Sequence, residues 1–284
     1  MITLPDEITP AISDLTANNI LFVGDYGIGK TGLAASTKYL LVDPEDKAKS
    51  YPCMKVVLTS WQDHKDLVKK LAAAPAGKYP GIALDSLNIS YDHCTAWVMK
   101  NIKFDGILLN HPSEKPQTAY PRVTNEFVTW LREMTYLGYH VVATCHSMVS
   151  EVTAKNGAKY NRWIPAFTGG SAGSTYASVL KVFSIVGFMT MEEVVKPSTR
   201  TVMGKAVPDV RADATRIETS ETRVIYFSQS ANWLANNKLN GFPDKVVLTD
   251  NWAEDWDILT KSWNTSGDGH ELVEDEIKTG GLKA

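Results

Sequence analysis

The amino-acid sequence predicts an α/β protein with a mostly parallel, twisted sheet flanked by helices and with antiparallel strands toward the C-terminal end. Short apolar runs alternate with helical patterns from residue 19 to about 147, and this alternation is typical of βαβ units. The first run, Ile20–Val23, leads into the glycine-rich stretch Gly24–Thr31 and then into helix-forming residues. A strand, a glycine loop and a helix in this order are a known unit of parallel sheets.

The elements of the first hundred residues follow one another at short intervals. A helix continues from the glycine-rich stretch to Lys38, because alanine and leucine favour helix there. Three further apolar runs predict buried strands, and helical patterns follow the second and third of them. The predicted strands are residues 39–42, 56–58 and 81–86, and the predicted helices are residues 62–73 and a stretch ending near residue 100.

The middle of the chain adds one long helix and one buried strand. Residues 101–121 contain several prolines and predict an irregular segment. From Pro121 onward, apolar side chains recur at helical spacing until Gly138, which ends the helix. The apolar run His140–His146 predicts the next strand.

The C-terminal part has a different pattern. Val149–Trp163 predicts a β-hairpin that turns at Asn156-Gly157, and Val182–Met191 and Arg223–Phe227 predict antiparallel edge strands. The last residues are acidic with few large apolar groups, which is typical of a flexible segment. We therefore expect one domain over residues 1–262 and a flexible acidic tail over residues 263–284.

The bulk composition excludes several classes of protein. The chain has 284 residues, 44% of them hydrophobic, enough for one large domain. A net charge of −3 gives no overall attraction to nucleic acid, so such binding needs a local basic patch. The N-terminus has no hydrophobic signal core, and no apolar stretch reaches membrane-spanning length. We expect a cytoplasmic protein without a membrane partner.

The glycine-rich stretch has the complete pattern of a phosphate-binding loop, Gly followed by four residues and then Gly-Lys-Thr. Glycines let backbone N–H groups turn toward a triphosphate. Lys30 is expected to reach the β- and γ-phosphates, and Thr31 to hold Mg²⁺. The predicted cofactors are therefore ATP and Mg²⁺. The predicted nucleotide-binding residues are Gly24, Asp25, Tyr26, Gly27, Ile28, Gly29, Lys30 and Thr31.

Three further side chains follow predicted strands and are expected at the same carboxyl edge of the sheet. Asp85 is the candidate for the Mg²⁺ carboxylate, with Asp43 as the alternative, and either could instead cap a following helix. Glu45 is a candidate general base for water, or part of a solvated acidic loop. His146 either senses the γ-phosphate or simply ends its strand.

With these residues in place, the chain resembles the RecA-core ATPases of bacteriophages, small relatives of the RecA recombinase that act in single-strand annealing and recombination. The phosphate-binding loop is specific for the wider superfamily, while the other stretches are individually degenerate and contribute through their order and spacing. The stretches that carry the resemblance are Gly24–Thr31, Leu41–Glu45, Thr59–Trp61, Ala83–Leu87, Val141–His146 and Trp233–Pro243.

The resemblance implies roles for several residues. It implies a RecA-like core in which Asp85 binds Mg²⁺, Glu45 activates water, and His146 couples the nucleotide to a DNA-binding loop. It also implies a ring or filament of identical subunits, in which a basic residue of the late segment reaches a neighbour's γ-phosphate. Here the first basic position of that segment is Asn236 and only Lys238 remains basic. A single ammonium is a weaker clamp than a Lys–Arg pair, so rapid hydrolysis between subunits is in doubt.

The same resemblance implies single-stranded DNA as a partner, with a single-strand-binding protein or other recombination proteins as further candidates. Basic and aromatic side chains interleave on the predicted hairpin, which suits phosphate pairing and base stacking. An ordinary hairpin with solvated lysines is the alternative. The candidate DNA-binding residues are Lys155, Lys159, Tyr160, Arg162 and Trp163. Two other functions remain open: a P-loop ATPase that acts as an assembly or regulatory switch, and a small-molecule phosphotransferase.

Overall fold

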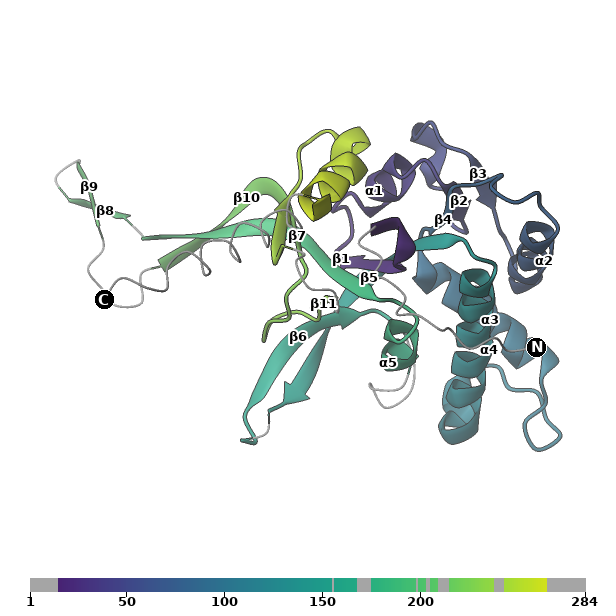
Figure 1. Cartoon of the computed structure of the whole chain (residues 1–284). Helices are drawn as coiled ribbons and strands as arrows, with labels where there is room; N and C mark the ends of the chain where they lie inside the picture. Colours follow the sequence, from purple (N-terminus) through teal and green to yellow (C-terminus); the bar gives the residue numbers. More distant parts are fainter. Residues whose placement is uncertain are drawn as a thin grey trace, which may run out of the picture.

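A computed structural model describes residues 15–154, 156–167, 175–197, 199–202, 205–208, 215–237 and 243–264. The described residues form a large sheet with helices on both faces (Figure 1). Its strands are β1 (Ile20–Gly24), β2 (Leu40–Asp43), β3 (Lys55–Val57), β4 (Gly81–Leu84), β5 (His140–Thr153), β6 (Lys159–Pro165), β7 (Ile185–Pro197), β10 (Thr215–Tyr226), β11 (Asn236–Asn237) and β12 (Lys245–Val247). A separate hairpin contains β8 (Thr199–Val202) and β9 (Lys205–Pro208).

The strand order confirms the predicted fold class. Along the sheet the order is β12-β10-β7-β1-β5-β4-β2-β3. The pairs from β3 to β7 are parallel, and β10 and β12 are antiparallel at the C-terminal end. Two strands differ from the predicted antiparallel edge strands. β7 is an internal strand that pairs in parallel with β1 and antiparallel with β10, and β10 in turn lies between β7 and β12. Ile185, Val186, Phe188 and Met189 of β7 are buried, and they pack on both faces of the sheet as an internal strand requires.

The two faces of the sheet carry separate halves of the core. Along β1, Leu21 and Val23 pack toward one core cluster, while Ile20 and Phe22 pack toward the other. This alternation follows from the two-residue period of a strand. Helices α2 (Trp61–Ala72), α3 (Leu87–Asn101) and α4 (Pro116–Tyr136) supply the first cluster. Helix α1 (Lys30–Ser36) and the helix over residues 255–264 supply the second.

Helix α4 begins earlier than the sequence pattern predicts. Pro116 occupies its first turn, where a missing N–H has no intrahelical partner to lose. Pro121 lies within the helix, which continues past it because Ala119 and Val123 are fully buried against the core. The short helix α5 (Thr175–Leu180) packs against α4. Among the described residues, no helix is long and apolar enough to cross a membrane.

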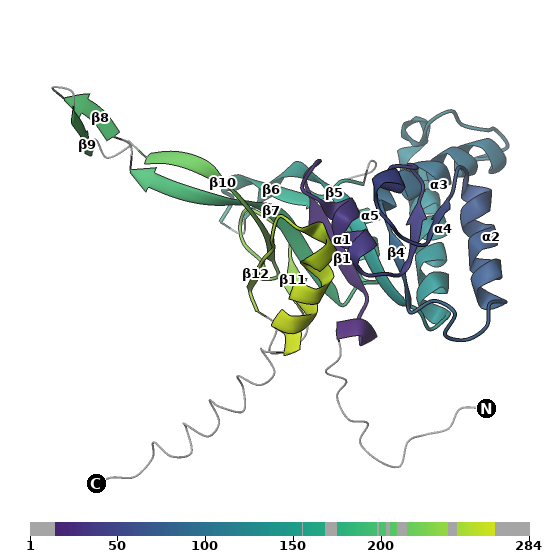
Figure 2. The ribbon, with the colours of Figure 1, turned by 90° about the horizontal axis from the view of Figure 1, so that it is seen from above.

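Two β-ribbons project from the body of the molecule. Strand β5 continues beyond the sheet and pairs with β6 in the predicted hairpin, which turns through Gly157 at a φ of 82°. The longer ribbon is formed by β7 and β10, with the β8–β9 hairpin at its far end. Figures 1 and 2 show this ribbon extending from the side of the sheet opposite α2, α3 and α4.

Candidate nucleotide-binding site

The loop between β1 and α1 has the backbone that a phosphate-binding loop needs. Gly27 and Gly29 adopt φ angles of 80° and 96°, a region that side-chain-bearing residues rarely enter. Gly24 ends β1 against β7, and a Cβ there would lie 2.6 Å from the carbonyl oxygen of Met189. Ile28 is buried in the second core cluster and anchors the loop. The loop is thus held at both ends while its glycines turn.

Lys30 lies inside this loop. Its Nζ donates hydrogen bonds to the carbonyl oxygens of Gly24 and Asp25, at 2.9 Å and 2.6 Å. His146 Nδ1 lies 3.3 Å from the same ammonium, so the imidazole accepts a hydrogen bond there. Burial lowers the pKa of Lys30, and the nearby Asp85 carboxylate opposes that shift. The ammonium is thus held by neutral acceptors, which a phosphate oxygen could replace.

Asp85 lies at the end of β4 and faces α1. Thr31 Oγ1 donates to Asp85 Oδ2 at 2.6 Å, and the Thr144 hydroxyl donates to Asp85 Oδ1. Burial raises the pKa of Asp85, while these two hydrogen bonds lower it. A hydroxyl and a carboxylate this close are hard oxygen donors of the kind Mg²⁺ prefers. The described residues hold no cluster of three or more His, Cys, Asp or Glu suited to a metal, but Mg²⁺ usually takes one or two carboxylates, waters and substrate phosphates.

Asp43 and Glu45, the two acidic candidates after β2, have different surroundings. Asp43 is buried and accepts hydrogen bonds from the backbone N–H groups of Glu45, Lys47 and Ala48. Its carboxylate therefore fixes the turn that presents Glu45. Glu45 itself accepts a hydrogen bond of 3.0 Å from Ser86 Oγ and forms an ion pair with Lys47.

His146 lies on β5 where that strand leaves the sheet. The Tyr26 ring stacks on its imidazole with a centroid distance of 5.9 Å, and Asn88 Oδ1 accepts a hydrogen bond of 2.7 Å from its backbone N–H. Burial lowers the pKa of His146, and the Lys30 ammonium lowers it further. The hydrogen bond from Lys30 requires an unprotonated Nδ1, and the lowered pKa favours that form.

These side chains meet in one cavity of about 220 Å³ at the carboxyl edge of the parallel strands. The structure thus brings together the predicted loop, metal and general-base residues, which come from four separate segments. It also adds Lys47, Tyr51 and Ser86, which sequence patterns did not indicate. Lys238 lies outside the described residues, and its predicted role stays a prediction. The cavity-lining residues predicted from sequence are Tyr26, Gly27, Gly29, Lys30, Thr31, Glu45, Asp85 and His146.

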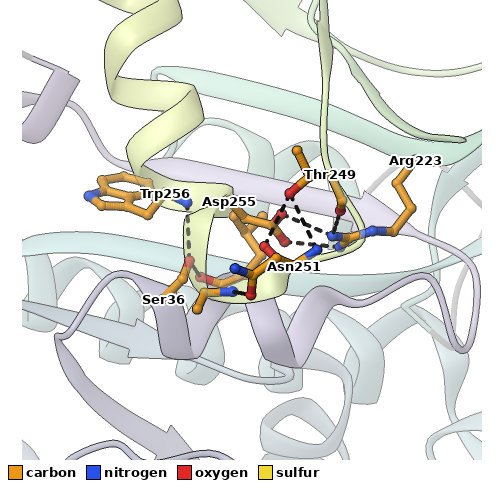
Figure 3. A network of polar contacts seen from close by, with 8 residues as sticks. Ser36, Arg223, Thr249, Asn251, Asp255 and Trp256 are labelled. Carbon is orange, nitrogen blue, oxygen red and sulfur yellow. Dashed lines mark hydrogen bonds and ion pairs between the residues drawn. The ribbon is translucent and has the colours of Figure 1, made fainter.

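A buried ion pair, shown in Figure 3, packs against the phosphate-binding loop. The guanidinium of Arg223 donates to both carboxylate oxygens of Asp255, at 2.9 Å and 3.0 Å, and also to the Thr249 carbonyl. A Cβ at Gly29 would lie 2.7 Å from Arg223 Nη1, so the guanidinium packs directly on the loop. Nearby, Ser36 Oγ accepts a hydrogen bond from the backbone N–H of Trp256. The C-terminal segment therefore braces the nucleotide loop and α1.

The predicted DNA-binding residues do not line this cavity. Lys159 is exposed and pairs with Glu151 at 2.8 Å. Arg162 is half-buried and donates to the Trp233 carbonyl at 3.3 Å, while Tyr160 and Trp163 are also half-buried. Lys155 lies outside the described residues. The structure thus places the hairpin beside the nucleotide site, with its described cations already in contact with protein groups.

A family model described as AAA domain matches residues 16–239. Among curated proteins, none matches the chain. The matched span covers most of the chain and contains every cavity residue named above. The chain therefore belongs to the AAA domain family and is a P-loop ATPase in class, with the nucleotide-binding fold predicted from its sequence.

Proposed function

We propose that this member of the AAA domain family hydrolyses ATP with Mg²⁺ and acts on single-stranded DNA in recombination or strand annealing, as a ring or filament of identical subunits. The observation that carries the enzymatic part is the convergence of Lys30, Thr31, Asp85 and Glu45 on one cavity. The DNA part rests on the resemblance to phage RecA-core ATPases and on the position of the β5–β6 hairpin beside that cavity.

In the proposed reaction, each side chain has a separate task. Lys30 would leave the loop carbonyls and bind the β- and γ-phosphates, while Thr31 and Asp85 would hold Mg²⁺. Glu45 would accept a proton from a water molecule while the oxygen of that water forms a bond to the γ-phosphorus. The bond between the γ-phosphorus and the β–γ bridging oxygen would break in the same step. Ser86 supports this role because its hydroxyl already orients the Glu45 carboxylate. Lys47 neutralises the same carboxylate before nucleotide binds.

Strand β5 offers a direct connection between nucleotide and hairpin. His146 contacts Lys30, and the same strand continues from Ser147 into the hairpin without a break. Ser147 Oγ donates to Asp25 Oδ1 at 2.7 Å, which ties the base of the hairpin to the phosphate-binding loop. A change at the γ-phosphate position would therefore act on the root of the proposed DNA-binding element.

A specific observation favours the second candidate function, a regulatory switch without DNA affinity. The Lys159 ammonium faces a carboxylate, and the Arg162 guanidinium contacts a protein carbonyl. The ion pair offsets the charge of Lys159, and the carbonyl occupies a donor of Arg162, so the hairpin offers fewer free contacts to phosphates.

ATP turnover and gel shift separate the two functions. We expect wild-type turnover to rise with single-stranded DNA more than with duplex DNA, and single-strand binding to tighten with ATP while staying detectable without it. Glu45→Gln should lower turnover by about 10²-fold or more while nucleotide binding persists. Asp46→Asn, in the same turn but half-buried and paired with Lys49 instead of Ser86, is the matched control. Near-normal turnover in Glu45→Gln would assign the base elsewhere, and no binding of single strands would favour the switch.

A further inference from the structure

A second cavity, of about 530 Å³, lies beside the hairpin and apart from the nucleotide cavity. It is formed by β5 and β6, by β7, by the end of β10 and by the segment around Trp233. Its volume falls within the range of small-molecule sites. Four of its lining residues are aromatic, Trp163, Phe188, Tyr226 and Trp233, and they lie together with one guanidinium, two exposed amides and the side chains of Val149, Thr190 and Met191. It shares no lining residue with the nucleotide cavity.

The rings of this cavity are held in fixed positions. Trp233 stacks on Phe188 at a centroid distance of 5.8 Å and an interplanar angle of 3°, and on Tyr226 at 4.5 Å. Trp233 Nε1 donates to the Ser228 carbonyl, and its backbone bridges to that of Trp163. Phe188 and Tyr226 are direct partners across β7 and β10. Rings fixed in this way lose little conformational entropy when a planar group stacks on them.

The polar groups of the cavity suit the edge of a planar heterocycle. Asn161 and Asn232 are exposed, and an amide offers both a donor and an acceptor. Arg162 lines the same cavity, and its Nε is buried without a hydrogen-bond partner among the described residues. A buried donor without a hydrogen-bond partner costs free energy. A ligand carbonyl that draws the guanidinium outward and accepts a hydrogen bond from it would remove this cost. Donors and acceptors beside stacked rings are what unstacked bases use.

We propose that this cavity binds an unstacked base of single-stranded DNA, against the rings of Trp163, Tyr226 and Trp233. This inference rests on the proposed function, and it changes how the hairpin would bind. Base stacking would supply most of the affinity, because the described hairpin cations already contact protein groups. Sequence tolerance follows, since every base has a face that can stack.

The cavity shares its strands with the nucleotide site. On β7, Phe188 lines the cavity, and the next residue, Met189, is the backbone partner of Gly24 in the phosphate-binding loop. On β10, Tyr226 lines the cavity, and Arg223 packs on Gly29 three residues earlier. A base that moves these strands would act on the loop directly.

The first experiment uses the wild-type protein and two fluorescein-labelled oligonucleotides. One is oligothymidine, and the other has the same sugar–phosphate backbone with abasic sites. Fluorescence anisotropy should show roughly 5- to 150-fold tighter binding of oligothymidine, the range for stacking of one base. Equal binding of both would overturn the base pocket while leaving DNA binding intact. Binding of neither would overturn the DNA part of the proposed function itself.

A second measurement locates the base without any substitution. Oligothymidine that carries 5-iodouracil should crosslink on irradiation to Trp163, Tyr226 or Trp233, identified by mass spectrometry of the peptides. Crosslinks confined to other residues would overturn the assignment. This measurement remains decisive where a tryptophan substitution prevents folding.

Substitution then tests the energy of stacking. Trp233→Leu should remove most of the preference for oligothymidine over the abasic strand. Trp97→Leu changes another half-buried tryptophan, on α3, and should leave the preference unchanged, with melting curves confirming both folds. A retained preference in folded Trp233→Leu would overturn the proposal. Loss of self-association in Trp233→Leu, with equal binding of both strands by wild type, would assign the cavity to a neighbouring copy of the chain.

Discussion

The nucleotide cavity and the aromatic cavity are built on opposite principles. In the nucleotide cavity, charged side chains such as Lys30 and Glu45 contact groups that a ligand can replace. In the aromatic cavity, the rings contact one another, and a ligand would add to the stack without displacing them. The first cavity therefore gains specificity from replaceable polar contacts, and the second gains tolerance from fixed apolar ones.

The two cavities are connected by shared strands, so substitutions can test whether they work separately. Strand β10 carries Arg223 to the nucleotide loop and Tyr226 to the rings, and β7 connects both regions in the same way. Each site can therefore be disabled by a local substitution, while a change to the shared framework affects both. The predictions below test this separation, from the largest expected effect to the smallest.

The largest effect is expected in the nucleotide cavity. Lys30→Ala removes the cation held inside the loop, and Asp85→Asn removes the carboxylate beside Thr31. We expect both variants to lose Mg²⁺-dependent turnover to the level of a blank reaction, measured by phosphate release. Crosslinking of single strands in the absence of nucleotide should persist in both, because the aromatic cavity is untouched.

The control for this prediction is Lys49→Ala, an exposed lysine near the same edge, which should turn over ATP like wild type. Turnover at the wild-type rate in Lys30→Ala or Asp85→Asn would show that the cavity is not the catalytic site. Loss of nucleotide-free DNA crosslinking in folded variants would show that the two sites are not separable.

A large effect on stability is expected behind the loop. Arg223→Met leaves the fully buried Asp255 carboxylate without its cation. Breaking a buried pair in this way costs about 3–5 kcal/mol of unfolding free energy. Chemical denaturation at about pH 8, monitored by tryptophan fluorescence, should show this loss. The double variant Arg223→Met/Asp255→Leu should recover most of it, since paired apolar residues often replace buried ion pairs without loss.

Acidification should reduce the loss of unfolding free energy that Arg223→Met causes. Burial raises the pKa of Asp255 to about 6, and the Arg223 ion pair opposes that rise. A carboxyl whose folded pKa is raised contributes stability below its unfolded pKa and loses it as pH rises through the folded value. Without Arg223 the pKa rises further, so the variant should take up a proton and regain stability as pH falls toward about 5. A penalty that grows on acidification relative to wild type would contradict this account.

The difference between the cavities also explains what the sequence could predict. Lys30, Thr31 and Asp85 follow strands within recognisable local patterns, so their meeting at one sheet edge could be inferred before the structure. The aromatic cavity draws Trp163, Phe188, Tyr226 and Trp233 from distant segments, and only tertiary register brings them together. The Arg223–Asp255 pair has no local signal either, because a single arginine in a strand is compatible with many roles.

The error about β7 has a different origin. Its nearly continuous apolar run, Ile185–Met189, is the pattern of a strand buried on both faces. The run could therefore have indicated an internal strand. Helix α4 begins at Pro116 because Ala119 and Val123 are buried against the core. The prolines nearby predicted an irregular segment instead, so the sequence did not indicate this first turn.

A smaller effect is expected at Ser86, whose hydroxyl orients the Glu45 carboxylate. Ser86→Ala removes one hydrogen bond, which corresponds to a decrease in kcat of about 2- to 10-fold. The KM for ATP should stay unchanged if Ser86 only positions the base, and Ser86→Thr should restore kcat. Ser90→Ala removes an equally buried hydroxyl that contacts His64 away from the cavity, and should leave kcat unchanged. A change in KM alone would make Ser86 a nucleotide contact.

The smallest effect is expected at Lys159, where the hairpin carries exposed charge. Its ion pair with Glu151 is solvent-exposed on both sides, so its loss should change the unfolding free energy by less than about 1 kcal/mol. If Lys159 meets a phosphate, Lys159→Ala should lower the log–log salt slope of oligothymidine binding by roughly 0.7. Trp233→Leu should instead weaken binding at every salt concentration with the slope unchanged.

Glu151→Ala is the matched variant for this last prediction, because it removes the opposing charge and leaves the ammonium in place. It should tighten oligothymidine binding slightly, while the slope stays at least as steep as in wild type. Anisotropy titrations at several salt concentrations measure all three variants together. An unchanged affinity and slope in folded Lys159→Ala would remove phosphate pairing from this side of the hairpin. The aromatic cavity would then stand alone as the DNA contact, in full contrast to the charged cavity that binds nucleotide.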